Sequence, residues 1–217
     1  MIRKISLIGL FIGALLICGC AKEEPEASSA PSTAPSVDNV DNESKPVVNE
    51  DVSVGNKKVK LQTTMGDIVI EMQSQAAPDT VKNFIQYVES GFYDGIIFHR
   101  VIKGFMIQTG GFNAQMQQKQ PNPPIKNEFK ISNTRGTVAM AKLGGNPDSA
   151  TCQFFISVAD NSRNLDNQNG GFTVFGKVVE GMDVVDEIAA VQTTVRNGMR
   201  DVPAEMITIT SASVVSQ

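Results

Sequence analysis

The segment FHRVIKGFMIQTGG, residues 98–111, decides the fold of this 217-residue chain. Its order of apolar and polar residues predicts two short strands joined by a turn at Lys103-Gly104. Successive side chains of a strand point to opposite faces of the sheet. Phe98, Arg100 and Ile102 are therefore expected on one face of the first strand.

The second strand of this segment follows the same rule. Alternation puts Met106 and Gln108 on one face, and Phe105 and Ile107 on the other. A charged group among so many apolar side chains costs free energy unless it is paired. The guanidinium of Arg100 cannot lose its proton to avoid that cost. One interpretation is a local salt bridge at a sheet edge, and the other is a binding or catalytic site.

Three later segments favour a functional site over a local salt bridge. They are TVAMA at 137–141, QFFI at 153–156 and FTVFGKV at 172–178. Together with segment 98–111, and in this order, they resemble the cyclophilin family of peptidyl-prolyl cis/trans isomerases. The resemblance is co-linear from about Val59 to Val215. No one of these segments would suffice alone.

Composition and charge limit the classes of partner. Hydrophobic residues make up 41% of the chain, which is enough for a packed core, and the formal net charge is −4. Residues 20–56 hold two basic and eight acidic side chains, whereas residues 57–217 hold 15 of each. Nucleic acid requires a basic protein face, so we do not expect this chain to bind it.

The N-terminus resembles that of a bacterial lipoprotein. Two positive charges precede an apolar run at residues 5–17, which is short for a transmembrane helix and suits a signal peptide. The run ends in a lipobox-like LICGC, so residues 1–19 are predicted to be removed and Cys20 to be lipidated. Cys18 is the weaker candidate, because a bulky Ile precedes it. An ordinary signal peptide and an uncleaved anchor are the alternatives.

The next segment, residues 20–56, is expected to be a disordered tether. It is rich in Ala, Ser, Pro and acidic residues and has no aromatic residue, so it cannot bury enough surface to offset its ordering entropy. Acyl chains such as palmitate on Cys20 would anchor the folded domain, residues 57–217, to the cell envelope. The expected location is extracytoplasmic, on the periplasmic side of the outer membrane or the outer face of the cytoplasmic membrane.

The folded part is predicted to be mainly β. A hairpin around Met65-Gly66-Asp67 is followed by a helix from Pro78 to Gly91, and a second helix follows Gly181. Polar loops are expected at 111–124 and 161–171, and further strands at 138–141, 153–158, 172–179 and 206–215. Many short strands with two helices favour a closed antiparallel barrel capped by helices. The cyclophilin resemblance implies that this barrel has eight strands and an active site on its outer surface.

The resemblance also implies which residues form the site. Arg100 matches the family's catalytic arginine, and Gln108 matches a glutamine that orients it and contacts the substrate carbonyl. The side chains expected to form the pocket for the proline ring are Phe105, Met106, Phe155, Leu165 and Phe172. Ala141 and Gln153 would border the groove for the residue before proline, and backbone groups near Lys142 would hold the peptide.

This residue set suits rotation about an X–Pro bond. Resonance of the imide nitrogen lone pair sets a barrier of roughly 18–20 kcal/mol. A permanent donor aimed at that nitrogen weakens the partial double bond and binds the twisted form best, and Arg is such a donor. The expected function is isomerisation of proline-containing exported polypeptides by a monomer that needs no cofactor. The alternatives are a non-catalytic peptide-binding or chaperone module on the same scaffold, and a structural envelope lipoprotein.

Two reactive residue types have structural interpretations. His99 is the single His, and strand alternation points it away from the face of Arg100, so we expect a structural hydrogen-bonding role. Cys152 is the single Cys of residues 57–217, and we expect a small buried residue rather than a reactive thiol. So few soft ligands give no basis for a transition-metal site.

Overall fold

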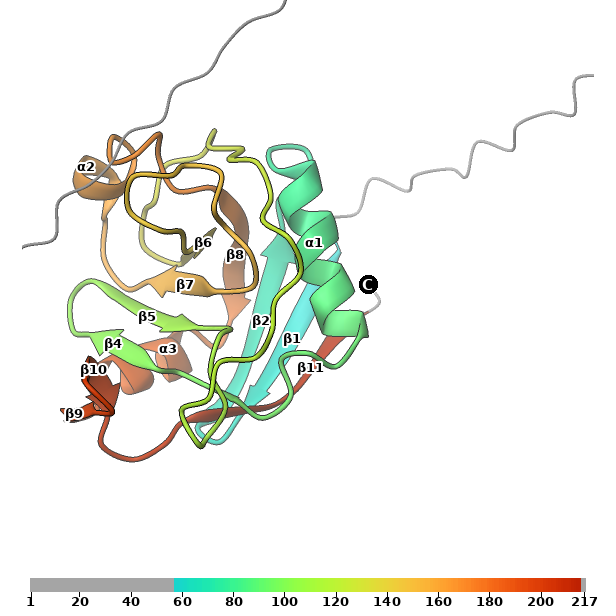
Figure 1. Ribbon diagram of the computed structural model, residues 1–217. Coiled ribbons are helices and arrows are strands. Elements are labelled where there is room, and N and C mark those ends of the chain that lie inside the picture. The colour runs from blue at the N-terminus through green and yellow to red at the C-terminus, as the bar shows by residue number, and fades with distance from the viewer. Residues whose placement is uncertain (1–56, 216–217) are drawn as a thin grey trace, which may run out of the picture. The chain divides into compact units, whose positions relative to one another are not determined.

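A computed structural model describes residues 57–215 (Figure 1). The predictions for residues 1–19 and 20–56, including Cys20, lie outside the described residues. The strands are β1 (Lys58–Thr63), β2 (Gly66–Met72), β3 (Ile96–Ile97), β4 (Arg100–Ile102), β5 (Met106–Thr109), β6 (Thr137–Met140), β7 (Phe154–Ser157), β8 (Val174–Glu180), β9 (Thr193–Arg196), β10 (Met199–Pro203) and β11 (Thr208–Val215). The helices are α1 (Pro78–Glu89), α2 (Ser162–Leu165) and α3 (Met182–Ala190).

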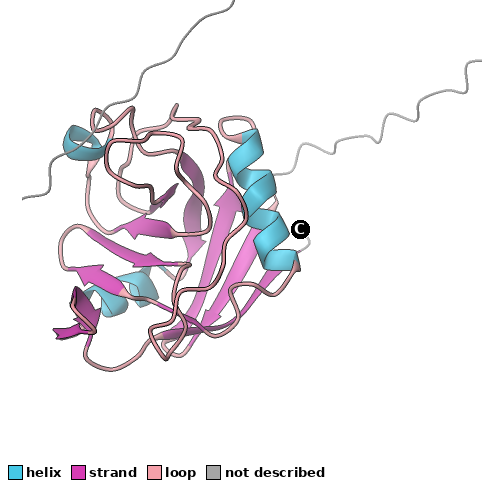
Figure 2. Cartoon of the chain, viewed as in Figure 1, coloured by secondary structure: helices cyan, strands magenta, loops and turns pink. Residues whose placement is uncertain are grey.

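Nine strands of the described part form one curled antiparallel sheet in the order β3-β11-β1-β2-β8-β6-β7-β5-β4 (Figure 2). The predicted mainly β, antiparallel class is confirmed, but the closed eight-stranded barrel is wrong. The sheet has edges at β3 and β4, which are consecutive strands separated by Phe98 and His99. The Phe98 N–H still donates to the oxygen of Ile207, the residue before β11, on the β3 side of the sheet, and two residues later Arg100 pairs with β5 at the other edge. The covalent chain, rather than a hydrogen-bond ladder, therefore joins the two edges.

The two predicted helices are present as α1 and α3. Helix α1 lies next to β11 and β8, and α3 lies next to β2, β5 and β4. Three further elements occur where the sequence predicted none. The short helix α2 lies inside the expected polar loop 161–171, and β9 pairs with β10 in a separate two-stranded sheet. None of the helices among residues 57–215 is both long and apolar enough to span a bilayer.

Strands β4 and β5 separate two apolar clusters. Val101 and Ile107 belong to the main core, whereas Met106 belongs to a second cluster. The prediction that Phe98 shares a face with Arg100 is wrong, because Phe98 lies before the chain crosses between the sheet edges and is fully buried in the main core. The second cluster is made of Met106, Ala139, Phe155, Leu165 and Val174, with Ile102, Phe105, Ile131, Ala141 and Phe172 packed against it.

The position of Phe105 also differs from the prediction. It packs on the second cluster together with Met106, rather than on the face of Ile107. Phe105 belongs to the turn that precedes β5, and strand alternation begins only at Met106. Phe105 and Met106 therefore both contribute to the same surface of the sheet.

The N-terminus of α1 is capped by a distant side chain. The helix begins after Ala77, which has no polar side-chain atom to offer. The Glu128 carboxylate accepts hydrogen bonds from the N–H of Asp79 at 3.3 Å and of Thr80 at 2.8 Å, and from the Thr80 hydroxyl at 2.7 Å. A carboxylate at this end also complements the helix dipole. Glu128 thus attaches the loop before β6 to the helix.

We expect Glu128→Ala to lower the free energy of unfolding by about 1–2 kcal/mol, because two helix N–H groups lose their acceptor. The measurement is chemical denaturation of the full chain, followed by circular dichroism. Glu187→Ala, which removes an exposed carboxylate from α3, is the matched control and should change the value by less than about 0.5 kcal/mol. Equal effects of the two substitutions would contradict the capping role.

Candidate active site

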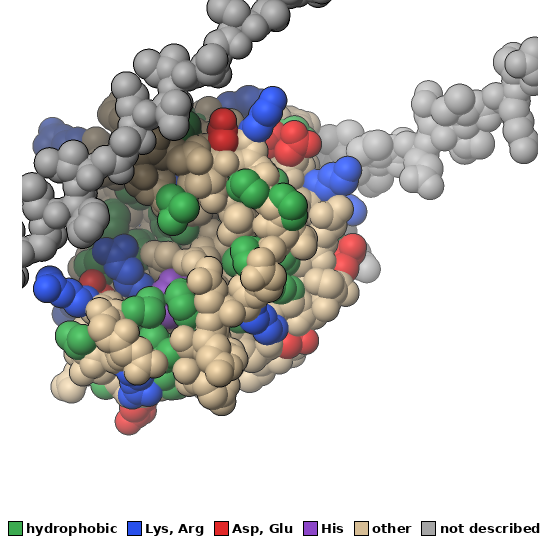
Figure 3. Space-filling view, viewed as in Figure 1, with side chains coloured by type: hydrophobic (Ala, Val, Ile, Leu, Met, Phe, Trp, Pro, Cys, Tyr) green, Lys and Arg blue, Asp and Glu red, His purple; other side chains and the backbone are tan. Residues whose placement is uncertain are grey.

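Arg100 lies on β4 opposite Gln108 of β5, and both side chains line one surface cavity of about 350 Å³. The residues that line this cavity, here called the proline-pocket cavity, are Arg100, Phe105, Met106, Gln108, Ala141, Lys142, Phe155, Leu165, Gln168 and Phe172. On the face seen in Figure 3, hydrophobic side chains lie in small groups among polar surface, with Lys and Arg side chains between them. Segments far apart in the sequence thus meet at one place.

The sequence-based list of site residues corresponds closely to this cavity. Nine of its ten members line it, and Gln153 lies next to it in an adjoining cavity. Gln168 is a lining residue that the motifs did not indicate. It lies in a polar segment without a recognisable pattern, so only its distance from Phe172 along the chain could have suggested it. The roles of these residues remain predictions.

The apolar wall of the proline-pocket cavity is rigidly packed. The rings of Phe155 and Phe172 meet edge to face, with centroids 5.7 Å apart, which is a favourable aromatic geometry. Met106, Phe155 and Leu165 are almost fully buried in the second cluster. The side chains of this wall therefore hold a cavity that a compact apolar ring can enter.

The guanidinium of Arg100 is not buried in a salt bridge. Its Nε lies 3.8 Å from Oδ2 of Asp201, and the two side chains are 44% and 41% exposed. An exposed pair at this distance contributes little to stability. Asp201 belongs to β10, and its φ of 63° is unusual for a residue other than glycine. The sequence did not indicate this partner, because the β9–β10 hairpin was not predicted.

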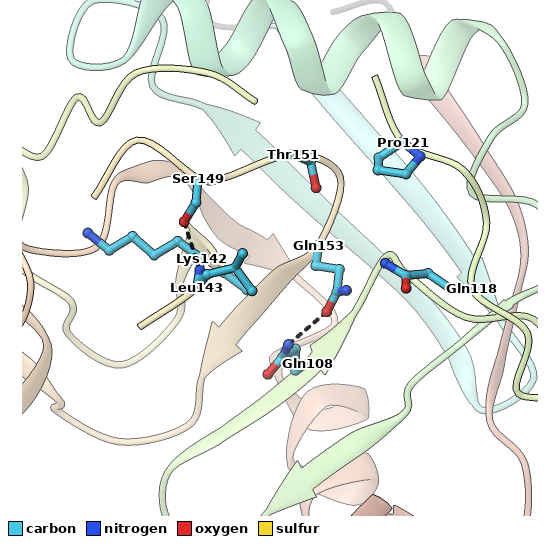
Figure 4. Close-up of a pocket in the computed structure, with 9 residues that line it drawn as sticks. Gln108, Gln118, Pro121, Lys142, Leu143, Ser149, Thr151 and Gln153 are labelled. Atoms are coloured by element: carbon cyan, nitrogen blue, oxygen red, sulfur yellow. Dashed lines mark hydrogen bonds between the residues drawn. The ribbon is translucent and has the colours of Figure 1, made fainter. Parts of the chain in front are cut away.

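Gln108 is oriented by a second glutamine. Its Nε2 donates to Oε1 of Gln153 at 3.0 Å, and the two side chains point toward one another from β5 and from the residue before β7 (Figure 4). The amide nitrogen of Gln108 therefore faces Gln153, and the side-chain oxygen of Gln108 takes no part in this hydrogen bond. Gln108 therefore lies between the two cavities in one defined orientation.

The adjoining cavity, also about 350 Å³, is lined mainly by residues with polar side chains (Figure 4). It shares Gln108, Ala141 and Lys142 with the proline-pocket cavity, and its other lining residues are Gln118, Pro121, Leu143, Ser149, Thr151 and Gln153. Ala141 and Gln153 are also joined by a backbone hydrogen bond of 2.9 Å from Ala141 N to Gln153 O. A peptide that placed one residue in the first cavity could extend its chain over the second.

His99 is buried and lines neither cavity. Its ring packs 4.8 Å from that of Phe112, and Nδ1 has no hydrogen-bond partner among the described residues. Burial lowers the pKa of His99 to about 4, and the nearby positive charge of Arg100 acts in the same direction. The side chain is therefore neutral at neutral pH and belongs to the protein interior.

Cys152 is almost fully buried, as expected. Burial raises the pKa of its thiol, so the nucleophilic thiolate is disfavoured. Its backbone oxygen accepts a hydrogen bond of 3.0 Å from the Tyr93 hydroxyl. This residue supports the packing behind the adjoining cavity.

Comparisons with known proteins agree with the fold and the cavity. Residues 58–214 match the family model described as cyclophilin type peptidyl-prolyl cis-trans isomerase/CLD. A peptidyl-prolyl cis-trans isomerase of Acinetobacter baylyi is 48% identical over 167 residues, covering 76% of this chain and 88% of that protein. Peptidyl-prolyl cis-trans isomerase B of Escherichia coli is 52% identical over 163 residues, covering 72% and 98%.

A solved structure extends this similarity to three dimensions. A cyclophilin-type isomerase of Cryptosporidium parvum, crystallised in the presence of the dipeptide Ala-Pro, has a TM-score of 0.62 and 25% identity, covering 74% of this chain and 99% of that one. The chain belongs to the cyclophilin-type peptidyl-prolyl cis-trans isomerase family. The enzyme class expected from the sequence is thereby confirmed.

The buried His99 makes stability depend on pH in a window that can be tested. Its pKa is about 4 in the folded chain and about 6.5 when exposed, so the unfolded chain binds more protons between these values. The free energy of unfolding should therefore fall as the pH falls, by roughly 1.5–2 kcal/mol between pH 7 and pH 5. Since this is the single His of the chain, His99→Gln should remove that slope.

Chemical denaturation at a series of pH values measures the effect. The comparison concerns the slopes, so a change in overall stability caused by the substitution does not affect it. Parallel slopes for the wild type and His99→Gln between pH 5 and pH 7 would show that His99 is not buried in its neutral form.

Proposed function

We propose that this protein catalyses rotation about X–Pro bonds of exported polypeptides, with Arg100 as the residue that stabilises the twisted imide. The observation that carries the proposal is the position of Arg100 in a cavity whose other walls are largely apolar. The proline-pocket cavity suits a proline ring, and the guanidinium of Arg100 supplies hydrogen-bond donors beside it. Proline-containing peptides are accordingly the expected ligands.

The energetic requirement is moderate. Raising a rate from about 0.01 to about 1,000 per second lowers the barrier by roughly 7 kcal/mol. As the bond twists, the lone pair returns to the imide nitrogen, and a donor aimed at that nitrogen binds the twisted form more strongly than either planar form. The fixed donor fork of Arg100 would supply this preorganised stabilisation without nucleophilic chemistry.

The neighbouring side chains have supporting roles in this proposal. Phe105, Met106, Phe155, Leu165 and Phe172 would hold the proline ring, and the orientation of Gln108 by Gln153 would present an amide to the carbonyl of the preceding residue. The adjoining cavity, bordered by Ala141 and Gln153, would accept the chain before proline. The contact of Asp201 with Arg100 is a 3.8 Å approach to Nε, which supports a role of the terminal guanidinium nitrogens in binding the substrate.

We expect Arg100→Ala to lower kcat/KM for a proline-containing peptide at least about a hundredfold, because the stabilising charge is lost while the apolar wall of the proline-pocket cavity remains. A protease-coupled isomerisation assay on the full chain measures this. Lys103→Ala, which removes an exposed cation from the β4–β5 turn, is the control and should leave the rate within about twofold. Unchanged catalysis in Arg100→Ala, with peptide binding intact, would favour the non-catalytic peptide-binding module.

We further propose that the protein acts as a lipid-anchored monomer on the extracytoplasmic side of the bacterial envelope. The support is the sequence of residues 1–20, with its charged start, apolar run and terminal LICGC. Acyl chains on Cys20 would give durable membrane attachment. The acidic segment that follows would act as a solvated spacer that holds the folded domain clear of the lipid.

Cys20→Ser should abolish incorporation of labelled palmitate and move the protein out of the membrane fraction, because the acceptor thiol is lost. Cys18→Ser is the matched control, and it should keep both properties. Cell fractionation with radiolabelled fatty acid measures the outcome. Loss of label from Cys18→Ser with retention in Cys20→Ser would assign the lipid to the other cysteine.

A further inference from the structure

Lys142 lines both cavities, but its side chain points away from Gln108 and Gln118. It lies two residues after the end of β6 and lines the proline-pocket cavity as well as the adjoining one. In the close-up its side chain runs away from Gln108 and Gln118 (Figure 4). The ammonium therefore lies toward the segment that precedes β8, rather than over the peptide groove.

The ammonium of Lys142 makes three contacts with one loop. Nζ donates to the backbone oxygen of Asn169 at 2.7 Å and to that of Gly171 at 2.5 Å. It also lies over the ring of Phe172, 4.8 Å from the ring centroid, which is within the range of a cation–π contact. The side chain is half-buried, and burial lowers its pKa. One side chain thus joins the end of β6 to the wall of the proline-pocket cavity.

This loop, residues 168–171, needs support because its backbone is unusual. Asn169, Gly170 and Gly171 all have positive φ values, of 52°, 78° and 74°. Consecutive left-handed residues are sparsely populated and persist only where their surroundings hold them. Their three backbone oxygens accept hydrogen bonds from only two side chains among the described residues, those of Lys142 and Asn127. Removing the Lys142 ammonium would leave Asn127 as the side chain among the described residues that donates to these oxygens.

The loop matters for the site because both of its ends reach the cavity. Gln168 at its start lines the proline-pocket cavity, and Phe172 directly after it forms the aromatic wall with Phe155. A shift of the loop would therefore move this wall relative to Arg100. Binding to a disordered wall has to order it first, which weakens affinity.

We propose that the side chain of Lys142 is a positioning residue that preforms the proline pocket by holding loop 168–171 and the ring of Phe172 against the cavity. This inference rests on the proposed function for its catalytic consequence. Backbone groups near Lys142 are expected to hold the peptide. The same residue would then bind the peptide through its backbone and hold the pocket wall through its side chain. Its charge acts on the protein itself and makes no contact with the reacting bond.

The test uses three substitutions in the full chain. Lys142→Met keeps the length and the apolar stem but removes the ammonium, and Lys142→Arg restores a cation with several donors. Lys119→Met is the matched control. Lys119 is also half-buried, donates from Nζ to the backbone oxygen of Phe92 at 2.6 Å and lies 5.1 Å from the centroid of the Phe92 ring, but it lines neither cavity.

We expect Lys142→Met to raise KM for a peptide containing Ala-Pro roughly 3- to 10-fold, with kcat within about twofold of the wild type, since the loss concerns ordering of the pocket rather than the twisted imide. Lys142→Arg should recover most of the change, and Lys119→Met should have no effect on KM. Hydrogen exchange at the Gly171 N–H, which donates to Gln168 O at 3.0 Å, should accelerate in Lys142→Met only.

The outcomes separate this inference from the proposed function. An inactive wild type, or full activity in Arg100→Ala, would contradict the proposed function, and the exchange rate of Gly171 together with the dissociation constant of the peptide would still decide the role of Lys142. If Lys142→Met leaves KM, the dissociation constant and the exchange rate unchanged, or changes them no more than Lys119→Met does, the positioning role is overturned.

Discussion

The antiparallel pairing of β4 with β5 is the constraint on which the rest of the site depends. Its register puts Arg100 opposite Gln108 and Val101 opposite Ile107. One face of the pair therefore enters the main core, while the other presents a guanidinium and an amide to a surface cavity. A one-residue slip would exchange the two faces and bury the charge. Core packing thus fixes the position of the proposed catalytic residue.

Around this pair, the site is assembled from segments distant in sequence. Phe155 arrives from β7 and packs on Phe172 from the segment before β8, and both rest on the second apolar cluster. Polar side chains then set the distances between these elements. The Gln108–Gln153 bond joins β5 to β7, and Lys142 joins β6 to loop 168–171. Apolar packing and polar side-chain hydrogen bonds therefore act together to hold the residues of the site in place.

The electrostatics of the site follow from exposure. Arg100 stays half exposed, so its permanent charge is maintained without the large desolvation cost of a buried ion. His99, the residue before Arg100, faces the interior and is neutral because burial lowers its pKa to about 4. Two adjacent residues that could both carry charge thus lie in different surroundings, His99 in the interior and Arg100 at the cavity. This separation leaves Arg100 as the cation that faces the cavity from β4.

Local pattern alone determined the helices α1 and α3, the β1–β2 hairpin and, through motif resemblance, nearly all lining residues of the proline-pocket cavity. These features depend on periodicity and on residues close together in the chain. Tertiary structure alone decided that the sheet stays open at Phe98–His99, that Asp201 approaches Arg100 and that Lys142 binds the oxygens of loop 168–171. Each of these depends on contacts between segments far apart in the sequence, which leave no periodic signal. Asp201 and residues 169–171 of the loop also have positive φ values, a backbone conformation that the packed surroundings stabilise.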